Sequence, residues 1–299
     1  MTMAAPTMVW WLLVFAALVL LVGYWGAGIV LHPPSMSPMA YFPENYGLPY
    51  EKTSFQTSDG LTLRGWFIPS AKGEGAPTIL MCHGWGDNKG ELLDDTHFLA
   101  EKGGYNLFYY DNRSHGESEG TITTMGALEL IDFEAAVKHL LEMRPSAGAR
   151  LGAFGLSMGA SVLAMALGRH PEIRAAVLDS PFPSYRGVVR RWAWNKFRAP
   201  YVPIVWATLK MLKWRAGNRE IDRYSPVNFI GQVKNRPLLF IAGGQDTLMP
   251  VEDVKSIYDA ANGCPKEFWV VPAAAHGKCH EAAGPEYESR VLAFFEKSL

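Results

Sequence analysis

One serine of the chain stands where nucleophilic catalysis requires it. Ser157 is the centre of a Gly-Leu-Ser-Met-Gly motif between a β-type run, Leu151 to Phe154, and a helical segment rich in Ala, Leu and Met. Glycines two residues either side allow a turn so tight that the hydroxyl stands free of the sheet. A serine hydroxyl is a weak nucleophile at neutral pH, so it needs a base, and the base needs an acid that fixes its tautomer. The motif therefore predicts acyl transfer through Ser157.

A candidate acid and a candidate base follow Ser157 in the required order. Asp246 comes just after the apolar run Leu238 to Ala242, and His276 comes after the next run, Glu267 to Val271. Catalytic groups gather where the carboxyl ends of parallel strands meet. We therefore predict that Ser157, Asp246 and His276 act as nucleophile, orienting acid and base.

Other residues remain open for these roles. Asp246 has an alternative interpretation as a turn or cap aspartate. Asp179 also ends a β-type run and is an alternative acid, although a Ser-Pro pair follows it directly. His280 lies one helical turn beyond His276 and is an alternative base, although we expect it inside the last helix. The remaining histidines are scattered and no His-Glu-x-x-His motif occurs, so we expect neither a metal nor another cofactor.

Acyl transfer also needs donors for the oxyanion. We expect them from two backbone amides, that of Met158, next to the nucleophile, and that of Trp85 in the His-Gly-Trp-Gly stretch after a β-type run. His83, at the start of this stretch, is interpreted as a structural histidine that binds loop backbone.

The elements that must position these residues alternate along the chain. Two β-type runs around an Asp-Gly turn (53–57 and 61–68) predict antiparallel opening strands. Alternating strands and helices follow, which is typical of a mostly parallel, doubly wound α/β sheet with helices on both faces. We predict strands at 78–82, 106–110, 151–154, 175–178, 238–242 and 267–271, and helices at 89–102, 125–143, 157–168 and 251–261, with a last helix ending near Lys297.

One block, residues 183–229, interrupts the alternation. It is too long for a plain connection and is interpreted as an inserted helical cap. It holds ten Lys or Arg residues against two acidic ones, a net charge of +8, whereas 18 basic and 27 acidic residues give the rest of the chain −9. It also holds four of the ten tryptophans. The whole chain, at −1, shows no bias toward nucleic acid.

The N-terminus has a different character. Met8 to Leu31 is a run of 24 residues without a charged side chain, about 36 Å long as a helix, which suffices to cross a bilayer. We predict an uncleaved single-pass anchor in residues 1–31, followed by a Pro-rich stalk in 32–52. A cleaved signal peptide is the alternative, but no Lys or Arg precedes the run. The side of the membrane on which residues 53–299 lie cannot be deduced, since the first basic residue is Lys52.

Cysteines add little. Cys82, Cys264 and Cys279 are an odd number, which excludes a fully paired disulfide framework. Cys264 and Cys279 would be able to pair in an oxidising compartment, whereas Cys82 reads as a small buried apolar residue.

The chain resembles the α/β-hydrolase superfamily, in particular single-pass membrane-anchored members similar to serine aminopeptidase-like hydrolases. The likeness covers roughly residues 53–299 and rests on the His83-Gly84-Trp85-Gly86 loop, the stretch 110–118, the motif at Ser157, and Asp246 and His276. In similar proteins the middle stretch usually has a glycine where Ser114 stands here. The resemblance implies structural roles for Asp111, Arg113 and His115, and it does not choose the substrate.

Three functions are therefore weighed. The first is hydrolysis of a carboxylic ester or thioester through an acyl-enzyme on Ser157. The second is an aminopeptidase-like serine peptidase with the same triad, and the third is a catalytically silent, membrane-anchored binding protein. The basic cap is either a solvated lid whose arginines pair with the acidic body, or a surface that contacts anionic lipid and favours lipid or acylated substrates.

Overall fold

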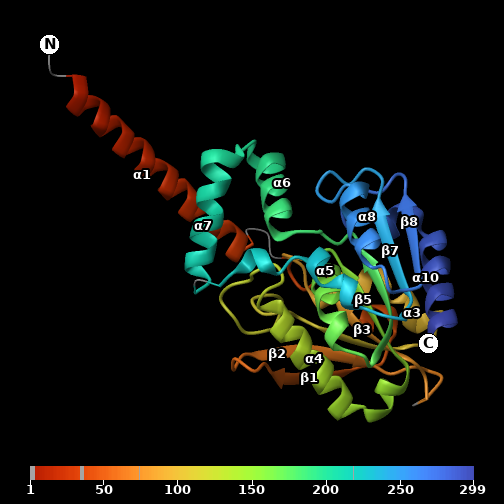
Figure 1. Ribbon diagram of the computed structural model, residues 1–299. Helices are drawn as coiled ribbons and strands as arrows, with labels where there is room; N and C mark the ends of the chain where they lie inside the picture. The colour runs from red at the N-terminus through yellow and green to blue at the C-terminus, as the bar shows by residue number, and fades with distance from the viewer. Residues whose placement is uncertain (1–3, 34–36, 74, 218) are drawn as a thin grey trace.

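An eight-stranded sheet forms the centre of the protein. The computed structural model describes residues 4–33, 37–73, 75–217 and 219–299, and Figure 1 shows the sheet at the core of the body. The strand order is β1-β2-β4-β3-β5-β6-β7-β8. β2 is the one strand of this sheet that runs opposite to all the others, because it pairs antiparallel with β1 and β4 while every other pairing is parallel. The strands are β1 Glu51–Gln56, β2 Thr62–Ile68, β3 Thr78–Cys82, β4 Asn106–Tyr110, β5 Leu151–Leu156, β6 Ile173–Asp179, β7 Leu238–Gly243 and β8 Lys266–Val271.

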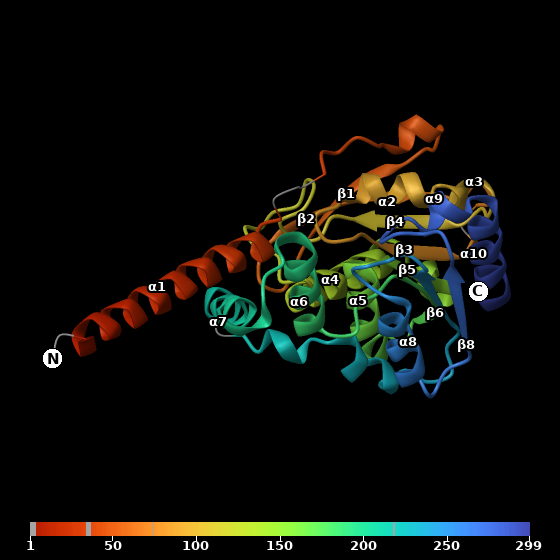
Figure 2. The same ribbon diagram turned by 90° about the horizontal axis from the view of Figure 1, so that it is seen from above.

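Helices cover both faces of the sheet and create two apolar cores. One core contains side chains of α4, α5 and α8, and the other contains side chains of α2, α3 and α10; Figure 2 shows the two layers on either side of the strands. The helices are α1 Ala4–Leu31, α2 Lys89–Thr96, α3 Phe98–Glu101, α4 Glu129–Met143, α5 Met158–Ala166, α6 Tyr185–Phe197, α7 Trp206–Arg215, α8 Val251–Ala260, α9 Cys279–Ala283 and α10 Pro285–Ser298. Short 3₁₀ turns and one π turn are η1 Pro43–Tyr46, η2 Pro145–Arg150, η3 Leu167–Arg169, η4 Tyr201–Val205 (the π turn), η5 Ile221–Arg223, η6 Pro226–Asn228 and η7 Ile230–Gln232.

The predicted α/β class and the antiparallel opening strands are confirmed, and two helix predictions need correction. The helix expected over 89–102 is two helices, α2 and α3, with His97 between them. The helix expected from residue 125 begins at Glu129. Its carboxylate is buried and accepts hydrogen bonds from the Thr123 hydroxyl (2.7 Å) and from the amides of Thr124 (2.8 Å) and Gly126 (2.7 Å). These bonds hold residues 123–126 in a turn rather than a helix.

Much of the segment predicted as a stalk lies on the body. Asn88 donates to the Ser37 carbonyl (2.9 Å), and the Tyr46 hydroxyl donates to Asp94 (2.5 Å). The rings of Phe42 and Tyr50 each pack 5.7 Å from that of Trp66, centre to centre. β1 already begins at Glu51. Residues 34–36 of the predicted stalk and 1–3 of the predicted anchor lie outside the described residues.

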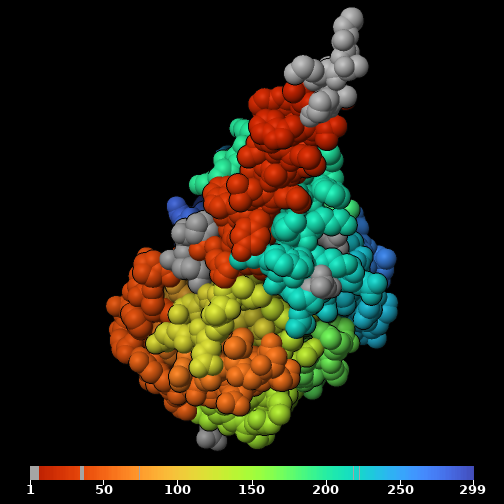
Figure 3. Space-filling model, turned by 90° about the vertical axis from the view of Figure 1, so that its left-hand side faces the viewer, coloured from red at the N-terminus to blue at the C-terminus, as the bar shows by residue number. Residues whose placement is uncertain are grey.

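Helix α1 has two parts with different surroundings. Residues 7–22 project away from the body and are largely exposed, as Figures 1 and 3 show. From Gly23 onward the helix packs against α7, so closely that a β-carbon on Gly23 would lie 2.8 Å from that of Ala207. Val30 and Leu31 are buried, and the Leu31 carbonyl accepts from the Thr123 amide (2.9 Å). Thr7–Leu31 is the one helix among the described residues that is long and apolar enough to cross a membrane.

Candidate active site

Ser157 stands on a strained turn between β5 and α5. Its φ of 53° lies in the left-handed region that side chains rarely occupy. Both flanking glycines are required by close contacts, because a β-carbon on Gly155 would lie 2.6 Å from the Ala160 backbone and one on Gly159 only 2.1 Å from the Cys82 carbonyl oxygen. The Ser157 amide donates to the Asp179 carbonyl (2.8 Å). The sequence thus places its predicted nucleophile at the carboxyl edge of the sheet, with the hydroxyl free to react.

The structure brings the other two predicted residues to Ser157. The Ser157 Oγ lies 2.9 Å from His276 Nε2, and His276 Nδ1 lies 2.7 Å from Asp246 Oδ2. The second oxygen of the buried Asp246 accepts from the amides of Leu248 (2.8 Å) and Met249 (2.7 Å). An ionised Asp246 can only accept, so the hydrogen bond to it assigns the ring proton of His276 to Nδ1 and leaves Nε2 as an acceptor facing the Ser157 hydroxyl.

Two glycines let the loops that carry Asp246 and His276 lie against each other. A β-carbon on Gly243 would be 2.6 Å from the Ala274 carbonyl oxygen, and one on Gly244 would be 2.6 Å from that of Pro272. The Gln245 amide also donates to the Ala274 carbonyl (2.9 Å). The close approach of the two backbones sets the distance between acid and base.

The alternative acid and base are engaged elsewhere. Asp179 is buried and accepts from the hydroxyls of Tyr287 and Ser180, both at 2.8 Å. Burial raises the pKa of Asp179 to about 6, a shift that these two hydrogen bonds partly offset. His280 belongs to α9 rather than to the last helix, contrary to expectation, and its Nδ1 lies 3.3 Å from Asp95 while its ring stacks on Phe98.

Two buried histidines fix the loop that carries Trp85. His83 Nδ1 donates to the Gly84 carbonyl (2.8 Å) and its Nε2 accepts from the Asn112 amide (2.9 Å). His115 uses its Nδ1 on the Arg113 carbonyl (2.8 Å) and its Nε2 on the Gly86 amide (3.1 Å). Burial lowers the pKa of both rings, so both remain neutral and keep these tautomers. They hold the backbone from Gly84 to Gly86 in place.

One residue near Ser157 was not found by sequence reasoning. A β-carbon on Gly84 would lie 3.4 Å from Asp87 Oδ2 and 3.7 Å from the Ser157 β-carbon, so Asp87 and Ser157 border Gly84 together. Burial, followed by the charges of Glu91 and Asp95, raises the pKa of Asp87 to about 6. The only signal in the sequence was an acidic residue directly after the His-Gly-Trp-Gly stretch.

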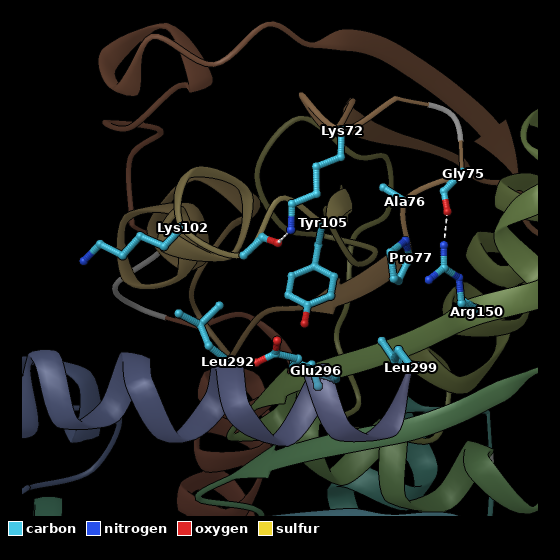
Figure 4. A pocket seen from close by; sticks show the side chains of 12 residues that line it. Lys72, Gly75, Ala76, Pro77, Lys102, Tyr105, Arg150, Leu292, Glu296 and Leu299 are labelled. Atoms are coloured by element: carbon cyan, nitrogen blue, oxygen red, sulfur yellow. Dashed lines mark hydrogen bonds between the residues drawn. The ribbon is translucent and has the colours of Figure 1, made fainter.

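A cavity of about 630 Å³ lies at the other edge of the sheet. Three of its lining residues, Pro77, Tyr105 and Arg150, directly precede β3, β4 and β5, so the cavity lies at the amino edge of the sheet (Figure 4). Two of its basic side chains bind backbone carbonyl groups: Lys72 Nζ donates to the Gly103 carbonyl (2.6 Å) and Arg150 donates to the Gly75 carbonyl. Figure 4 shows the Lys102 side chain directed away from the hollow. This cavity is thus separate from the Ser157 site.

The remaining chemistry of the cysteines is limited. All three are free thiols, and Cys82 and Cys279 are buried. The Cys264 Sγ contacts the Val233 carbonyl (3.3 Å). Among the residues that the structure describes, no group of three or more His, Cys, Asp or Glu side chains is arranged to hold a metal ion.

The mostly parallel sheet and the serine at the strand-to-helix turn define an α/β hydrolase. A model of the serine aminopeptidase S33 family matches residues 73–227, and the chain belongs to this family. An esterase from Pyrococcus furiosus has the same fold, with a TM-score of 0.74 at 28% sequence identity over 90% of this chain and 98% of the esterase. The chain is therefore a hydrolase by family and fold.

Two relatives extend the comparison. The uncharacterized protein YfhR of Escherichia coli O157:H7 is 30% identical over 258 residues, covering 83% of this chain and 81% of YfhR. The α/β hydrolase domain-containing protein WAV2 of Arabidopsis thaliana is 28% identical over 272 residues, covering 85% of this chain and 81% of WAV2.

Proposed function

We propose that the protein is a serine hydrolase that cleaves a carboxylic ester or thioester through an acyl-enzyme on Ser157. The observation that carries this proposal is the continuous relay from Ser157 Oγ to His276 Nε2 (2.9 Å) and from His276 Nδ1 to Asp246 (2.7 Å). The first distance suits transfer of the serine proton to the imidazole, and the second suits the hydrogen bond by which a carboxylate orients the ring.

In the proposed reaction Ser157 Oγ attacks the substrate carbonyl while His276 Nε2 takes its proton, and Asp246 stabilises the imidazolium that forms. The amides of Met158 and Trp85 donate to the oxyanion. Met158 is the first residue of α5, and the first amides of a helix have no partner within it. His276 then protonates the leaving group, and a water molecule activated by the same ring releases the acid from Ser157.

Labelling with a fluorophosphonate tests this proposal, because the reagent phosphonylates activated serines. We expect one adduct on Ser157 in the wild-type chain and none in Ser157→Ala. No wild-type adduct, or an equal adduct in Ser157→Ala, would leave the silent binding protein as the better interpretation. A series of acyl esters, acyl thioesters and aminoacyl amides would then rank the substrate classes.

Asp87 supports a second candidate, an aminopeptidase-like activity with the same triad. A carboxylate across Gly84 from the nucleophile can bind the α-ammonium group of a peptide, and the family match is to serine aminopeptidases. For a peptidase we expect Asp87→Asn to reduce aminoacyl amide hydrolysis at least tenfold with acetate esters little changed. If both activities persist in Asp87→Asn, Asp87 does not select the substrate.

For the chain as a whole we propose an anchor in residues 1–31, a linker in 32–52, and a hydrolase domain in 53–299 with its cap at 183–229. The exposed apolar stretch of α1, residues 8–22, is about 22 Å long, less than the ~30 Å of a bilayer core. If α1 spans the membrane, the bilayer would therefore also surround some of the residues from Gly23 onward that pack on α7. The cap would then lie at the membrane surface.

A further inference from the structure

An apolar cavity of about 130 Å³ lies between the anchor helix and the cap. Helix α1 contributes one wall, through Val22, Trp25 and Val30, and the cap contributes the other. Thr208 is the polar side chain among the lining residues, and its hydroxyl donates to the Ile204 carbonyl (3.0 Å). A ligand in this cavity would therefore contact mainly aliphatic and aromatic side chains. The cap residues lining it include Trp192, Ala193 and Phe197.

A row of aromatic rings connects this cavity to the loop beside Ser157. The Trp85 ring lies 5.8 Å from Trp192, Trp192 lies 5.5 Å from Phe197, and Phe197 lies 5.7 Å from Trp25, all between ring centres. Trp85 Nε1 also donates to the Val30 carbonyl of α1 (3.2 Å). The proposed oxyanion loop therefore contacts the anchor helix directly.

The outer end of the row faces the surroundings of α1. Trp25 is 57% and Phe197 is 46% exposed, and their rings contact each other across α1 and α6. Figure 3 shows the red surface of α1 next to the cyan surface of the cap. If α1 crosses a membrane, this level of the helix would lie near the interfacial region, where Trp is enriched.

We propose that this cavity binds the acyl chain of a membrane lipid ester, which enters from the leaflet between α1 and α6 and passes Trp192 and Trp85 to place its carbonyl at Ser157. This inference rests on the proposed function and adds to it the substrate class and the direction of entry. A volume near 130 Å³ compares with the 150 Å³ apolar cavity that accommodates benzene, so it has room for a short run of methylene groups. Each buried methylene favours a chain by about fourfold in binding.

Two substitutions with opposite effects on the cavity test the proposal. Ala193→Phe fills it and Phe197→Ala enlarges it, while Ala16→Phe places the same added ring on the exposed part of α1. The readout is the rate of Ser157 labelling by alkyl fluorophosphonates with a two-carbon or a ten-carbon chain, measured on the full chain in vesicles of phosphatidylcholine. We expect Ala193→Phe to lower the ratio of long-chain to short-chain rates at least tenfold, Phe197→Ala to raise it severalfold, and Ala16→Phe to leave it unchanged.

The outcomes separate this inference from the proposed function. If no reagent labels Ser157, the proposed function fails and the inference fails with it. If both reagents label Ser157 but Ala193→Phe and Phe197→Ala leave the ratio within twofold of the wild type, the hydrolase remains and the acyl-binding cavity is wrong. The two reagents differ only in chain length. If the ratio moves as expected, the cavity therefore binds a flexible chain, which contradicts a rigid ring ligand such as a sterol as its sole occupant.

Discussion

The carboxyl edge of the sheet and the proposed cap, residues 183–229 beside α1, differ in how they are built. At the sheet edge Ser157, His276 and Asp246 are joined by short hydrogen bonds, and carbonyl oxygens lie closer to Gly159, Gly243 and Gly244 than a β-carbon would allow. In the cap, large apolar side chains are exposed: Trp194 (51%), Trp206 (49%) and Trp214 (60%). Buried polar contacts fix the sheet edge, whereas the cap exposes large apolar side chains.

This difference separates two tasks. Under the proposed function, the sheet edge would carry out the same acyl transfer on many substrates, because its geometry depends on backbone contacts within the body. The cap would then select the substrate through the residues that line its cavity, and its exposed aromatic rings would be the first part of the protein to contact the substrate. Substitutions at the edge are therefore expected to change rate or stability, and substitutions in the cap to change preference.

The largest effect is expected at the acid. Asp246→Asn keeps the shape of the side chain but favours the wrong tautomer of His276, so we expect kcat on an acetate ester to fall by about 10⁴. Asp179→Asn is the matched control, since Asp179 bonds to Tyr287 and Ser180 rather than to His276, and we expect a change of a fewfold at most. Steady-state kinetics on both variants measure this. A larger loss in Asp179→Asn than in Asp246→Asn would exchange their roles.

The next effect concerns the fit of α5 on β3. A β-carbon at Gly159 would stand 2.1 Å from the Cys82 carbonyl oxygen, so Gly159→Ala must push the helix off the strand. We expect a loss of about 3 kcal/mol in the free energy of unfolding, read from urea denaturation. Gly168→Ala serves as the control, because its closest neighbour, Gln232 Cβ, would lie 3.2 Å away and would need to shift by only a few tenths of an ångström. Equal stability of the two variants would show that the turn is not held as tightly as these contacts require.

Asp179 also makes a prediction about pH. Its pKa is raised from 3.8 to about 6, so the folded state holds a proton that the unfolded state releases. The stability it contributes is complete below pH 3.8 and is lost as the pH rises through about 6. Between pH 3.5 and 7 we expect Asp179→Asn to gain about 3 kcal/mol relative to the wild type. Urea unfolding across this range measures the gain, and two parallel pH profiles would contradict it.

How much of this the sequence could predict depends on the range of the signal. The turn at Ser157 and the strands 78–82 and 106–110 follow from local patterns, because a buried parallel strand is a short apolar run and the Gly-x-Ser-x-Gly motif is read directly. The order of the triad residues along the chain came from the same local context.

The rest depends on contacts between distant residues. The position of Asp87 beside Ser157 depends on a loop fixed by His83 and His115. The start of α4 at Glu129 depends on a buried carboxylate. The packing of α1 on α7, with Gly23 against Ala207, leaves no periodic pattern in a uniformly apolar run, so neither the two parts of α1 nor the cavity beside it was foreseen.

The smallest predicted effect tests whether the cap contacts lipid. Arg190 is exposed, whereas its neighbour Arg191 is bound to the body through Asp253 and the Leu248 carbonyl. A cation near an anionic bilayer contributes about 1 kcal/mol. For a chain that begins at Gly23 and so keeps the packed part of α1, we expect Arg190→Gln to weaken binding to phosphatidylserine vesicles about fivefold and Arg191→Gln to weaken it less. Cosedimentation measures both. Equal binding of Arg190→Gln and the unsubstituted chain would mean that this part of the cap faces water rather than lipid.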